Sequence, residues 1–327
     1  MKSICYIIPY FGKLPQNFQL WLQSCSKNET INWIIFTDDA TKYEYPQNVK
    51  VIYTKFSDIK NLIQSKFDFK VNIDTYWRLS FFKPAYGEIF QEYIKNYDFW
   101  GYCDIDLMWG NIRKFITDDI LDNYERIGFQ GHSTLFKNIK KVNERYKVIV
   151  PNKVNYIDVF SGNVNYSFDE NGMDNIYKKL GLEYYKETNF AHLSKYDYGF
   201  VLKYLPKEDY YKNFRQVFIW NDGNLYRYYL DRKKNINKEE FMYIHFFCRP
   251  MKYEYDGNNL SNRYIIYPDK MKPFYEEVTL KLLQKYGKSS WIKYYYRNLY
   301  YNRKKITIKK ICGNIRRMVM HKLFKKY

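Results

Sequence analysis

The opening part of the chain alternates short apolar runs with a segment of helical spacing. The apolar runs at 3–8, 33–36 and 49–53 predict buried strands, because each is short and is bounded by Pro, Gly or polar residues. Residues 18–25 repeat apolar side chains at the spacing of a helix. Strands that alternate with helices predict a mostly parallel sheet covered on both faces, so we expect a chain of the α/β class.

A helical region separates these strands from a fourth predicted strand. Residues 57–67 and 75–96 have helical spacing, and Pro84 predicts a break or kink in the second segment. Five of the six residues at 98–103 are apolar, aromatic or Gly, which predicts a buried strand. This strand runs directly into Asp104-Ile105-Asp106, so acidic side chains follow a strand of the core.

The pattern is weaker in the second half of the chain. Residues 118–150 are mixed, and 156–168 show no clean period, which predicts a loop-rich segment lining a site. The remaining predicted elements are a helix at 173–180, a hairpin of 217–220 and 225–230 with an Asp-Gly turn, a strand at 241–247 and a helix at 270–286.

Composition supports a chain with a substantial core. It has 327 residues, of which 46% are hydrophobic and 27% charged, so general disorder is not expected. No run of about 18 apolar residues occurs, and the N-terminus lacks an apolar segment of signal-peptide length. The five Cys residues are scattered without a C-x-x-C pair. These features predict a protein of the reducing cytoplasm, with neither a zinc site nor a disulfide framework.

The net charge of +19 is concentrated near the C-terminus. Residues 288–327 contain thirteen Lys or Arg and no Asp or Glu, so a basic tail follows a nearly balanced body. From residue 306 the apolar positions share one helical face and the basic ones lie mainly off it. This pattern predicts a helix that lies on an anionic membrane surface. A helix packed on the body and a tail that binds nucleic acid non-specifically are the alternatives.

The acidic side chains after the fourth strand are the first candidate chemistry. Residues i and i+2 of an extended chain point to the same side, so Asp104 and Asp106 can converge on one cation while Ile105 returns to the core. Two carboxylates suit Mg²⁺ or Mn²⁺ and leave positions for phosphate oxygens and water. A solvated turn is the alternative. The apolar sequence on both sides favours the metal, because unpaired buried acids are costly.

His245 is the candidate third ligand. It interrupts an apolar strand and is followed by Arg249. A lone His in a strand is more often a core residue, but neutral imidazole is also a good ligand for Mn²⁺.

Five short stretches carry a resemblance to a known family. They are Tyr6-Ile7-Ile8-Pro9-Tyr10-Phe11-Gly12, Ile35-Phe36-Thr37-Asp38-Asp39, Lys83-Pro84-Ala85-Tyr86-Gly87, Trp100-Gly101-Tyr102-Cys103-Asp104-Ile105-Asp106 and Ile244-His245-Phe246. In this order they resemble the D-x-D glycosyltransferases of the GT-A fold that serve bacterial capsule, exopolysaccharide and lipopolysaccharide synthesis. Such enzymes transfer a sugar from a nucleotide diphosphate, usually UDP.

The resemblance implies a domain organisation. A Rossmann-like GT-A domain with a mixed, mostly parallel sheet would occupy 1–268. Its nucleotide-binding half would be 1–110, and 111–268 would contain the acceptor site and complete the metal site. A helical, strongly basic extension would follow at 269–327.

The resemblance also assigns the nucleotide site. Pro9, Tyr10 and Phe11 would flank the base, and Thr37 and Asp38 would contact uracil or ribose. The donor would be a UDP-sugar.

The metal, Mn²⁺ or Mg²⁺, would be held against the diphosphate by Asp104 and Asp106, with His245 as a late-chain ligand. Related sequences often have an acid before the Lys-Pro-Ala-Tyr-Gly stretch, but this chain has Ser80-Phe81-Phe82 before Lys83. This chain therefore has no acid at that point that could take part in the site.

Positive side chains could stabilise the negative charge that develops on the leaving diphosphate. Arg78, Lys83 and Arg249 are the candidates, and an ordinary solvated charge is the alternative for each.

A transfer that inverts configuration also needs a base for the attacking hydroxyl. Asp169-Glu170 is the first choice, with a helix N-cap as the alternative. His132, after another strand-like run, is expected to contact the donor or the acceptor.

The sequence therefore predicts a hexosyltransferase-type enzyme at the inner face of the plasma membrane. It would act on a lipid-linked glycan acceptor in bacterial surface polysaccharide synthesis. A basic, aromatic-rich nucleic-acid-binding protein is one alternative, although no nucleic-acid partner is expected because the body shows no recognition motif. A catalytically silent sugar-binding module is another.

Overall fold

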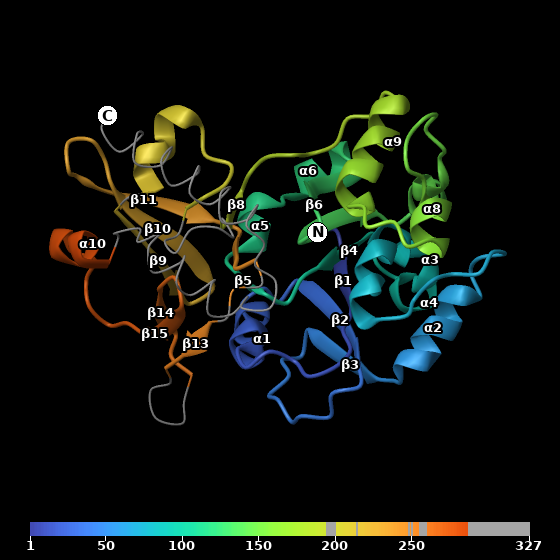
Figure 1. Cartoon of the computed structure of the whole chain (residues 1–327). Coiled ribbons are helices and arrows are strands. Elements are labelled where there is room, and N and C mark those ends of the chain that lie inside the picture. Colours follow the sequence, from blue (N-terminus) through green and yellow to red (C-terminus); the bar gives the residue numbers. More distant parts are fainter. Residues whose placement is uncertain (194–200, 214, 248, 250, 255–259, 287–327) are drawn as a thin grey trace, which may run out of the picture. The chain divides into compact units, whose positions relative to one another are not determined.

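The computed structural model describes the chain except for residues 194–200, 214, 248, 250, 255–259 and 287–327 (Figure 1). The described residues form two compact units. The first unit comprises residues 1–191, 222–225 and 241–245, and the second contains the rest. The predicted helix in the basic tail lies outside the described residues.

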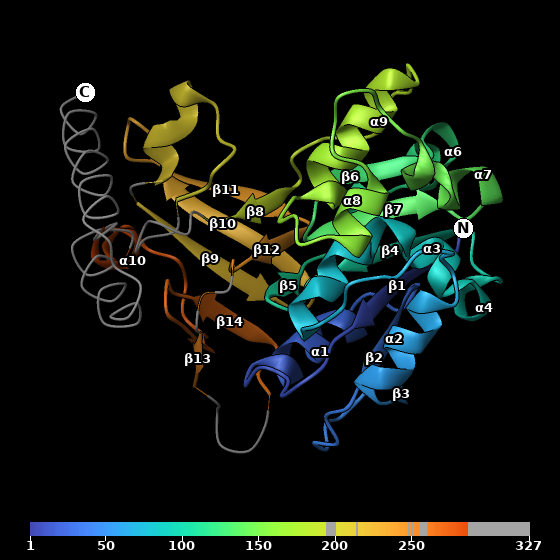
Figure 2. The same cartoon turned by 45° about the vertical axis from the view of Figure 1, so that its right-hand side comes forward.

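A six-stranded mixed sheet forms the centre of the first unit, in the order β3-β2-β1-β4-β7-β6 (Figure 2). Its strands are β1 (Ile4–Pro9), β2 (Ile31–Thr37), β3 (Val49–Tyr53), β4 (Phe99–Cys103), β6 (Arg126–Gln130) and β7 (Ser133–Lys137). The first four of these strands are parallel, and β7 and β6 are antiparallel to their neighbours. This arrangement confirms the predicted α/β class and the four early strands.

Successive strand residues point to opposite faces of the sheet, so apolar side chains on both faces need to be covered. On one face, Ile7 and Tyr102 belong to a core cluster with side chains of helices later in the chain. These helices include α2 (Phe56–Gln64), the 3₁₀ helix η1 (Tyr76–Ala85), α3 (Tyr86–Ile89), α4 (Gln91–Ile94), α7 (Lys140–Asn143), α8 (Tyr156–Ser161), the π-helix η3 (Phe168–Gly172) and α9 (Met173–Lys179). The shorter helices of the unit are α5 (Ile112–Phe115), α6 (Asp118–Asn123) and η2 (Arg145–Lys147).

The opposite face is packed with aromatic side chains. Tyr6 stacks on Trp33 with ring centroids 6.0 Å apart, and Trp21 of α1 (Phe18–Ser26) meets Trp33 edge-on. Trp109 of β5 (Leu107–Trp109) lies 5.3 Å from Tyr6. β5 is the first strand of a three-stranded sheet with β12 (Tyr243–His245) and β8 (Phe190–His192). This cluster fixes the position of the chain just after Asp106.

Two predicted elements are wrong. Residues 156–168 are not loop-rich throughout, because a capping box of Asn155 and Asp158 starts helix α8. The predicted helix at 270–286 is instead strand β15 (Lys270–Pro273) followed by α10 (Leu280–Tyr286). Pro273 disfavours helical conformation in the residue before it, which explains why the helix begins only later.

The sequence reading missed a second six-stranded sheet, in the order β11-β10-β9-β14-β15-β13; most of its residues belong to the second unit, whereas 224–225 and Phe241 belong to the first. Its other strands are β9 (Gln216–Asn221), β10 (Asn224–Leu230), β11 (Ile236–Phe241), β13 (Lys252–Tyr253) and β14 (Arg263–Ile266), and a 3₁₀ helix, η4, spans Lys207–Asn213. The predicted hairpin is confirmed as β9 and β10. Its turn residues Asp222 and Gly223 have φ of 45° and 86°, as a tight hairpin turn requires.

Ile219, Ile265 and Leu283 belong to the apolar core of the second unit. Within the described part of the chain, no helix is long and apolar enough to cross a membrane.

Candidate metal and substrate site

The strand β4 delivers two carboxylates to the edge of the first sheet. Every residue of β4 is buried, and the chain leaves the strand at Asp104, whose N–H donates to the carbonyl of His132 at 3.1 Å. Ile105 is buried, whereas the side chains of Asp104 and Asp106 are 35% and 27% exposed. The i, i+2 alternation therefore places both acids on the open side.

A strand from much later in the chain brings the imidazole to these acids. β12 pairs antiparallel with β5, and His245 lies opposite Leu107 in that register. As a result, Nε2 of His245 lies 3.2 Å from Oδ1 of Asp106 and 3.8 Å from Oδ2 of Asp104. One ligand atom from each of the three residues lies within 4.8 Å of the others, so this group could hold a metal ion. Two carboxylates and one imidazole suit Mn²⁺, and the exposed side leaves room for further oxygen ligands.

The ring of His132 packs against the imidazole of His245. Its ring centroid lies 4.2 Å from that of His245 and the two planes are tilted by 32°. His132 is buried, and its Nδ1 is hydrogen-bonded at 2.9 Å to the hydroxyl of Tyr243, two residues before His245 on β12. His132 therefore lies beside the candidate metal residues, and its predicted contact with donor or acceptor stays a prediction.

Lys83 adds a positive charge to the same site. Its ammonium donates to Oδ1 of Asp104 at 2.6 Å and to the carbonyl of Gly131 at 2.8 Å. Burial alone would lower the pKa of Lys83, but the carboxylates of Asp104 and Asp169 outweigh burial and raise that pKa above its usual value. Lys83 is therefore a permanent cation beside the acids.

Asp169 and Glu170 reach the site from the π-helix η3, a type of irregular turn that is frequent at functional sites. Glu170 Oε1 accepts the N–H of Gly131 at 2.8 Å. A Cβ at Gly131 would collide with the carboxylate of Asp169, which would then have to shift from this position. Burial raises the pKa of Asp169 to about 6, with further contributions from Glu170 and Asp104 that Lys83 partly offsets. Glu170 thus orders the backbone at Gly131, whereas Asp169 is a carboxyl group with a raised pKa.

The predicted nucleotide residues gather at the ends of β1 and β2. The N–H of Tyr10 donates to the carbonyl of Phe36, and the N–H of Gly12 donates to Oδ1 of Asp38 at 2.8 Å. Pro9 and Thr37 are the last residues of their strands, and Thr37 is fully buried.

Phe11 is also buried, and its ring packs 5.3 Å from that of Phe56. The carboxylate of Asp38 orders the loop after β1, while contacts of these residues with a nucleotide stay predictions.

Exposed aromatic side chains at this edge were missed by the sequence reading. Tyr76 and Trp77 at the start of η1 are 49% and 56% exposed, and Tyr53 at the end of β3 is 56% exposed. The ring of Tyr76 lies 6.2 Å from that of Phe11 and would contact a side chain added at Gly12. The signal available in the sequence was a pair of large aromatics at the polar start of a predicted helix.

Two of the predicted cationic residues have other partners. Arg78 is 3% exposed, and it donates to the carbonyls of Asn72, Val159 and Gly162 at 2.6–3.1 Å. It thereby ties η1 to helix α8. Arg249 lies in the second unit, where it donates to the carbonyl of Pro268 at 3.1 Å. Neither contact supports a role at the diphosphate, which stays a prediction.

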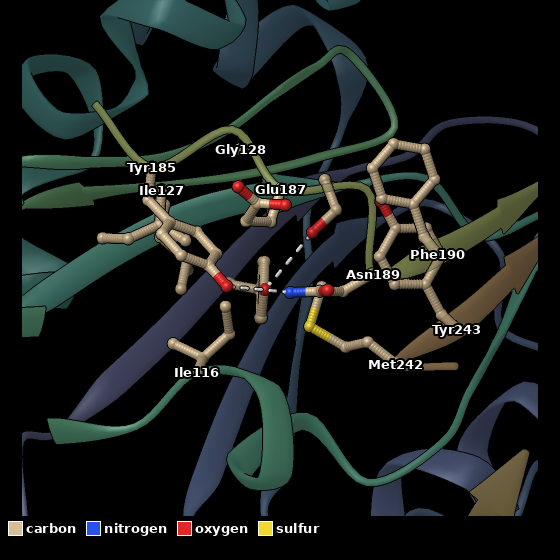
Figure 3. Close-up of a pocket in the computed structure, with 12 residues that line it drawn as sticks. Ile116, Ile127, Gly128, Tyr185, Glu187, Asn189, Phe190, Met242 and Tyr243 are labelled. Carbon is tan, nitrogen blue, oxygen red and sulfur yellow. Dashed lines mark hydrogen bonds between the residues drawn. The ribbon is translucent and has the colours of Figure 1, made fainter. Parts of the chain in front are cut away.

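A small pocket is lined in part by Tyr243, the residue whose hydroxyl is hydrogen-bonded to His132. Its apolar walls include Ile116, Ile127 and Met242. Figure 3 shows Asn189 and Tyr185 meeting in the pocket, where the Asn189 amide donates to the Tyr185 hydroxyl at 3.0 Å.

Comparison with known proteins identifies a family for this chain, but that family has no assigned activity. A family described as of unknown function (DUF6625) matches residues 6–275, which is well over half of the chain. None of the curated proteins matches the sequence. The matched range includes all the candidate residues above, from the end of β1 to His245 and Arg249. The chain therefore belongs to the DUF6625 family of unknown function.

Proposed function

We propose that the chain is a metal-dependent glycosyltransferase of the GT-A type that moves a sugar from a UDP-sugar to a glycan acceptor. The observation that carries this proposal is the convergence of Asp104, Asp106 and His245 at the end of β4. The group combines oxygen and nitrogen ligands, and it lies at the edge of a largely parallel sheet, where α/β proteins bind ligands. Bound there, a divalent cation would stabilise negative charge on the departing diphosphate.

In this proposal each residue at the candidate metal site has its own role. Asp104 and Asp106 would hold the cation, and His245 would complete the protein's share of the ligands. Lys83 neutralises part of the acidic charge through its 2.6 Å contact with Asp104. His132, whose ring packs against that of His245 and whose Nδ1 is hydrogen-bonded to the Tyr243 hydroxyl, would keep the His245 ring oriented, as residues behind metal ligands commonly do.

Asp169 is the better candidate of the two acids for the base. Glu170 already accepts a hydrogen bond from the backbone of Gly131, so its carboxylate serves to order that loop. The raised pKa of Asp169, about 6, lies close to neutral pH, where a general base works best. In this proposal Asp169 accepts the proton of the attacking hydroxyl if the reaction inverts configuration, and otherwise contacts the acceptor.

The nucleotide would occupy the ends of β1 and β2. Asp38 orders the loop that follows β1, and Tyr76 presents an exposed ring beside that loop. Pro9, Tyr10 and Phe11 would flank the base, and Thr37 and Asp38 would contact uracil or ribose, as the resemblance implies.

We also propose that residues 287–327 hold the enzyme at the inner face of the plasma membrane, where a lipid-linked acceptor is presented. The support is the concentration of Lys and Arg in this segment. The nucleic-acid alternative relies on the same segment.

A thermal-shift screen of UDP-sugars tests the proposal. Full-length protein should melt at a higher temperature with a UDP-sugar and Mn²⁺ together than with the UDP-sugar and a chelator, because a ligand that binds the native state stabilises it. Asp106→Asn should lose this difference. Release of UDP on addition of an acceptor would exclude the silent sugar-binding module, whereas no metal-dependent shift with any UDP-sugar would contradict the proposal.

A further inference from the structure

Lys83 engages only one of the two carboxylate oxygens of Asp104. Its ammonium lies 2.6 Å from Oδ1, whereas Oδ2 is the oxygen that faces Nε2 of His245, at 3.8 Å. The two oxygens of one side chain therefore have different partners. Only Oδ2 is directed to the group that Asp104 forms with Asp106 and His245.

The position of the Lys83 ammonium is held by a second contact. It donates to the carbonyl of Gly131 at 2.8 Å, and its side chain is 11% exposed. The backbone N–H of Gly131 is in turn bound to Glu170. This chain of contacts holds the ammonium against Oδ1 of Asp104 and leaves it little freedom to move away when a cation arrives.

An occupied oxygen changes how a carboxylate can bind a metal. Ca²⁺ takes six to eight oxygen ligands and often binds both oxygens of one carboxylate, whereas Mg²⁺ requires a six-coordinate shell with shorter bonds. Mn²⁺ also favours six ligands and accepts imidazole nitrogen. A carboxylate limited to one free oxygen therefore penalises Ca²⁺ more than the smaller ions.

We propose that Lys83 makes Asp104 a monodentate ligand and thereby selects Mn²⁺ or Mg²⁺ against Ca²⁺. This inference rests on the proposed function, because it requires Asp104, Asp106 and His245 to bind a divalent cation. Lys83 is a positioning residue in this account, because it acts on the metal through Asp104. A purely electrostatic role predicts something different, since a nearby positive charge weakens the binding of every divalent cation alike.

Calorimetric titration of the full-length protein with MnCl₂ and with CaCl₂, without nucleotide, separates these accounts. In Lys83→Met, which keeps an apolar stem of similar size but removes the ammonium with its charge and hydrogen bonds, both oxygens of Asp104 become available. The Kd for Ca²⁺ divided by the Kd for Mn²⁺ should fall by about tenfold, the lower end of the usual effect of residues behind metal ligands.

Lys147→Met is the matched control. It also removes a lysine from an ion pair, the one with Glu88 at 2.8 Å, and should leave the Kd ratio unchanged. If Lys83→Met does not fold, as judged by circular dichroism, Lys83→Gln replaces it and should shift the ratio in the same direction.

The outcomes distinguish this inference from the proposed function. A ratio that is the same in wild type and in the Lys83 variant would overturn the selectivity role while leaving the metal site intact. Failure of the wild-type protein to bind either cation would contradict the metal site itself, and the proposed function with it.

Discussion

Nε2 of His245 lies 3.2 Å from Oδ1 of Asp106, although His245 ends strand β12 and Asp106 lies far earlier in the sequence, just before β5. The pairing of β12 with β5 brings them together, because it places His245 opposite Leu107, the residue that follows Asp106. A hydrogen bond or weak ion pair alone would account for the distance. The carboxylate of Asp104 lies near the same imidazole, so the three side chains also form a group that could hold a metal ion.

Replacement of Asp104 or Asp106 by Asn tests whether the acids are ligands. Each variant should retain the fold but lose roughly a thousandfold or more in transfer rate, because a lost metal ligand removes several kcal/mol of transition-state stabilisation. Product formation from a UDP-sugar with purified variants is the measurement, with circular dichroism as the control for folding. Activity near the wild-type level in either variant would contradict the metal assignment.

His245→Ala tests the third ligand. UDP should bind wild-type protein more tightly with Mn²⁺ than with chelator, and this difference should shrink by about tenfold or more in the variant. Calorimetry under both conditions measures it. Tyr243→Phe, which removes the hydroxyl bonded to His132, should have a smaller effect in the same direction. An unchanged metal dependence in His245→Ala would make His245 a core residue only.

Asp169→Asn should stabilise the metal-free protein at neutral pH. The pKa of Asp169 is raised to about 6 in the folded state, chiefly by burial, so the folded protein binds this proton more tightly than the unfolded chain. The Asp169 side chain is half-buried, so its ionised carboxylate destabilises the fold by up to about 2 kcal/mol, a cost that is complete above pH 6. The gain from Asn should diminish as the pH falls from 6 towards 4, because the wild-type side chain then becomes neutral.

Urea denaturation in the presence of chelator at pH 4.5, 6 and 7.5 measures this effect, with Glu170→Gln as the control. A gain that is independent of pH would show that burial of the Asp169 charge is not its cause. Loss of transfer activity in the same Asp169 variant would agree with a trade of stability for function at this position.

The basic tail can be tested by deletion. Removal of residues 303–327 should release the protein from anionic liposomes and leave UDP binding unchanged, because each Lys or Arg near such a surface contributes about 1 kcal/mol. Co-sedimentation at low salt is the measurement, with neutral liposomes as the control. If the full-length protein fails to sediment with anionic liposomes, the membrane proposal is wrong. Sedimentation with nucleic acid instead would favour the alternative.

The early strands and the acidic pair could be read from the sequence because their signals are local. Each early strand is a continuous apolar run, and Asp104 and Asp106 depend only on the alternation of side chains along an extended chain. The hairpin of β9 and β10 was equally accessible, since Asp222 and Gly223 adopt the positive φ values that their residue types favour.

The remaining features depend on contacts that no local pattern encodes. The contact of Lys83 with Asp104 requires η1 to pack beside the end of β4, and the role of Gly131 becomes visible only when Asp169 lies over it. Nothing in the sequence shows that the guanidinium of Arg78 reaches the carbonyl of Gly162. The second sheet escaped notice because its β13 and β15 are short and polar residues interrupt them.

The strand pairing that supplies His245 also has a consequence for biosynthesis. Residues 1–191 emerge from the ribosome first and contain both acids, but the imidazole follows only after most of β9, β10 and β11 has been made. A nascent chain can thus form the first sheet while the group of Asp104 and Asp106 still lacks His245. Completing it requires a contact of long sequence separation, which tends to form late in folding. A cation bound by His245 and Asp106 would then hold β12, the last strand of the first unit, in place, so that metal supply during synthesis would influence how much protein reaches the native state.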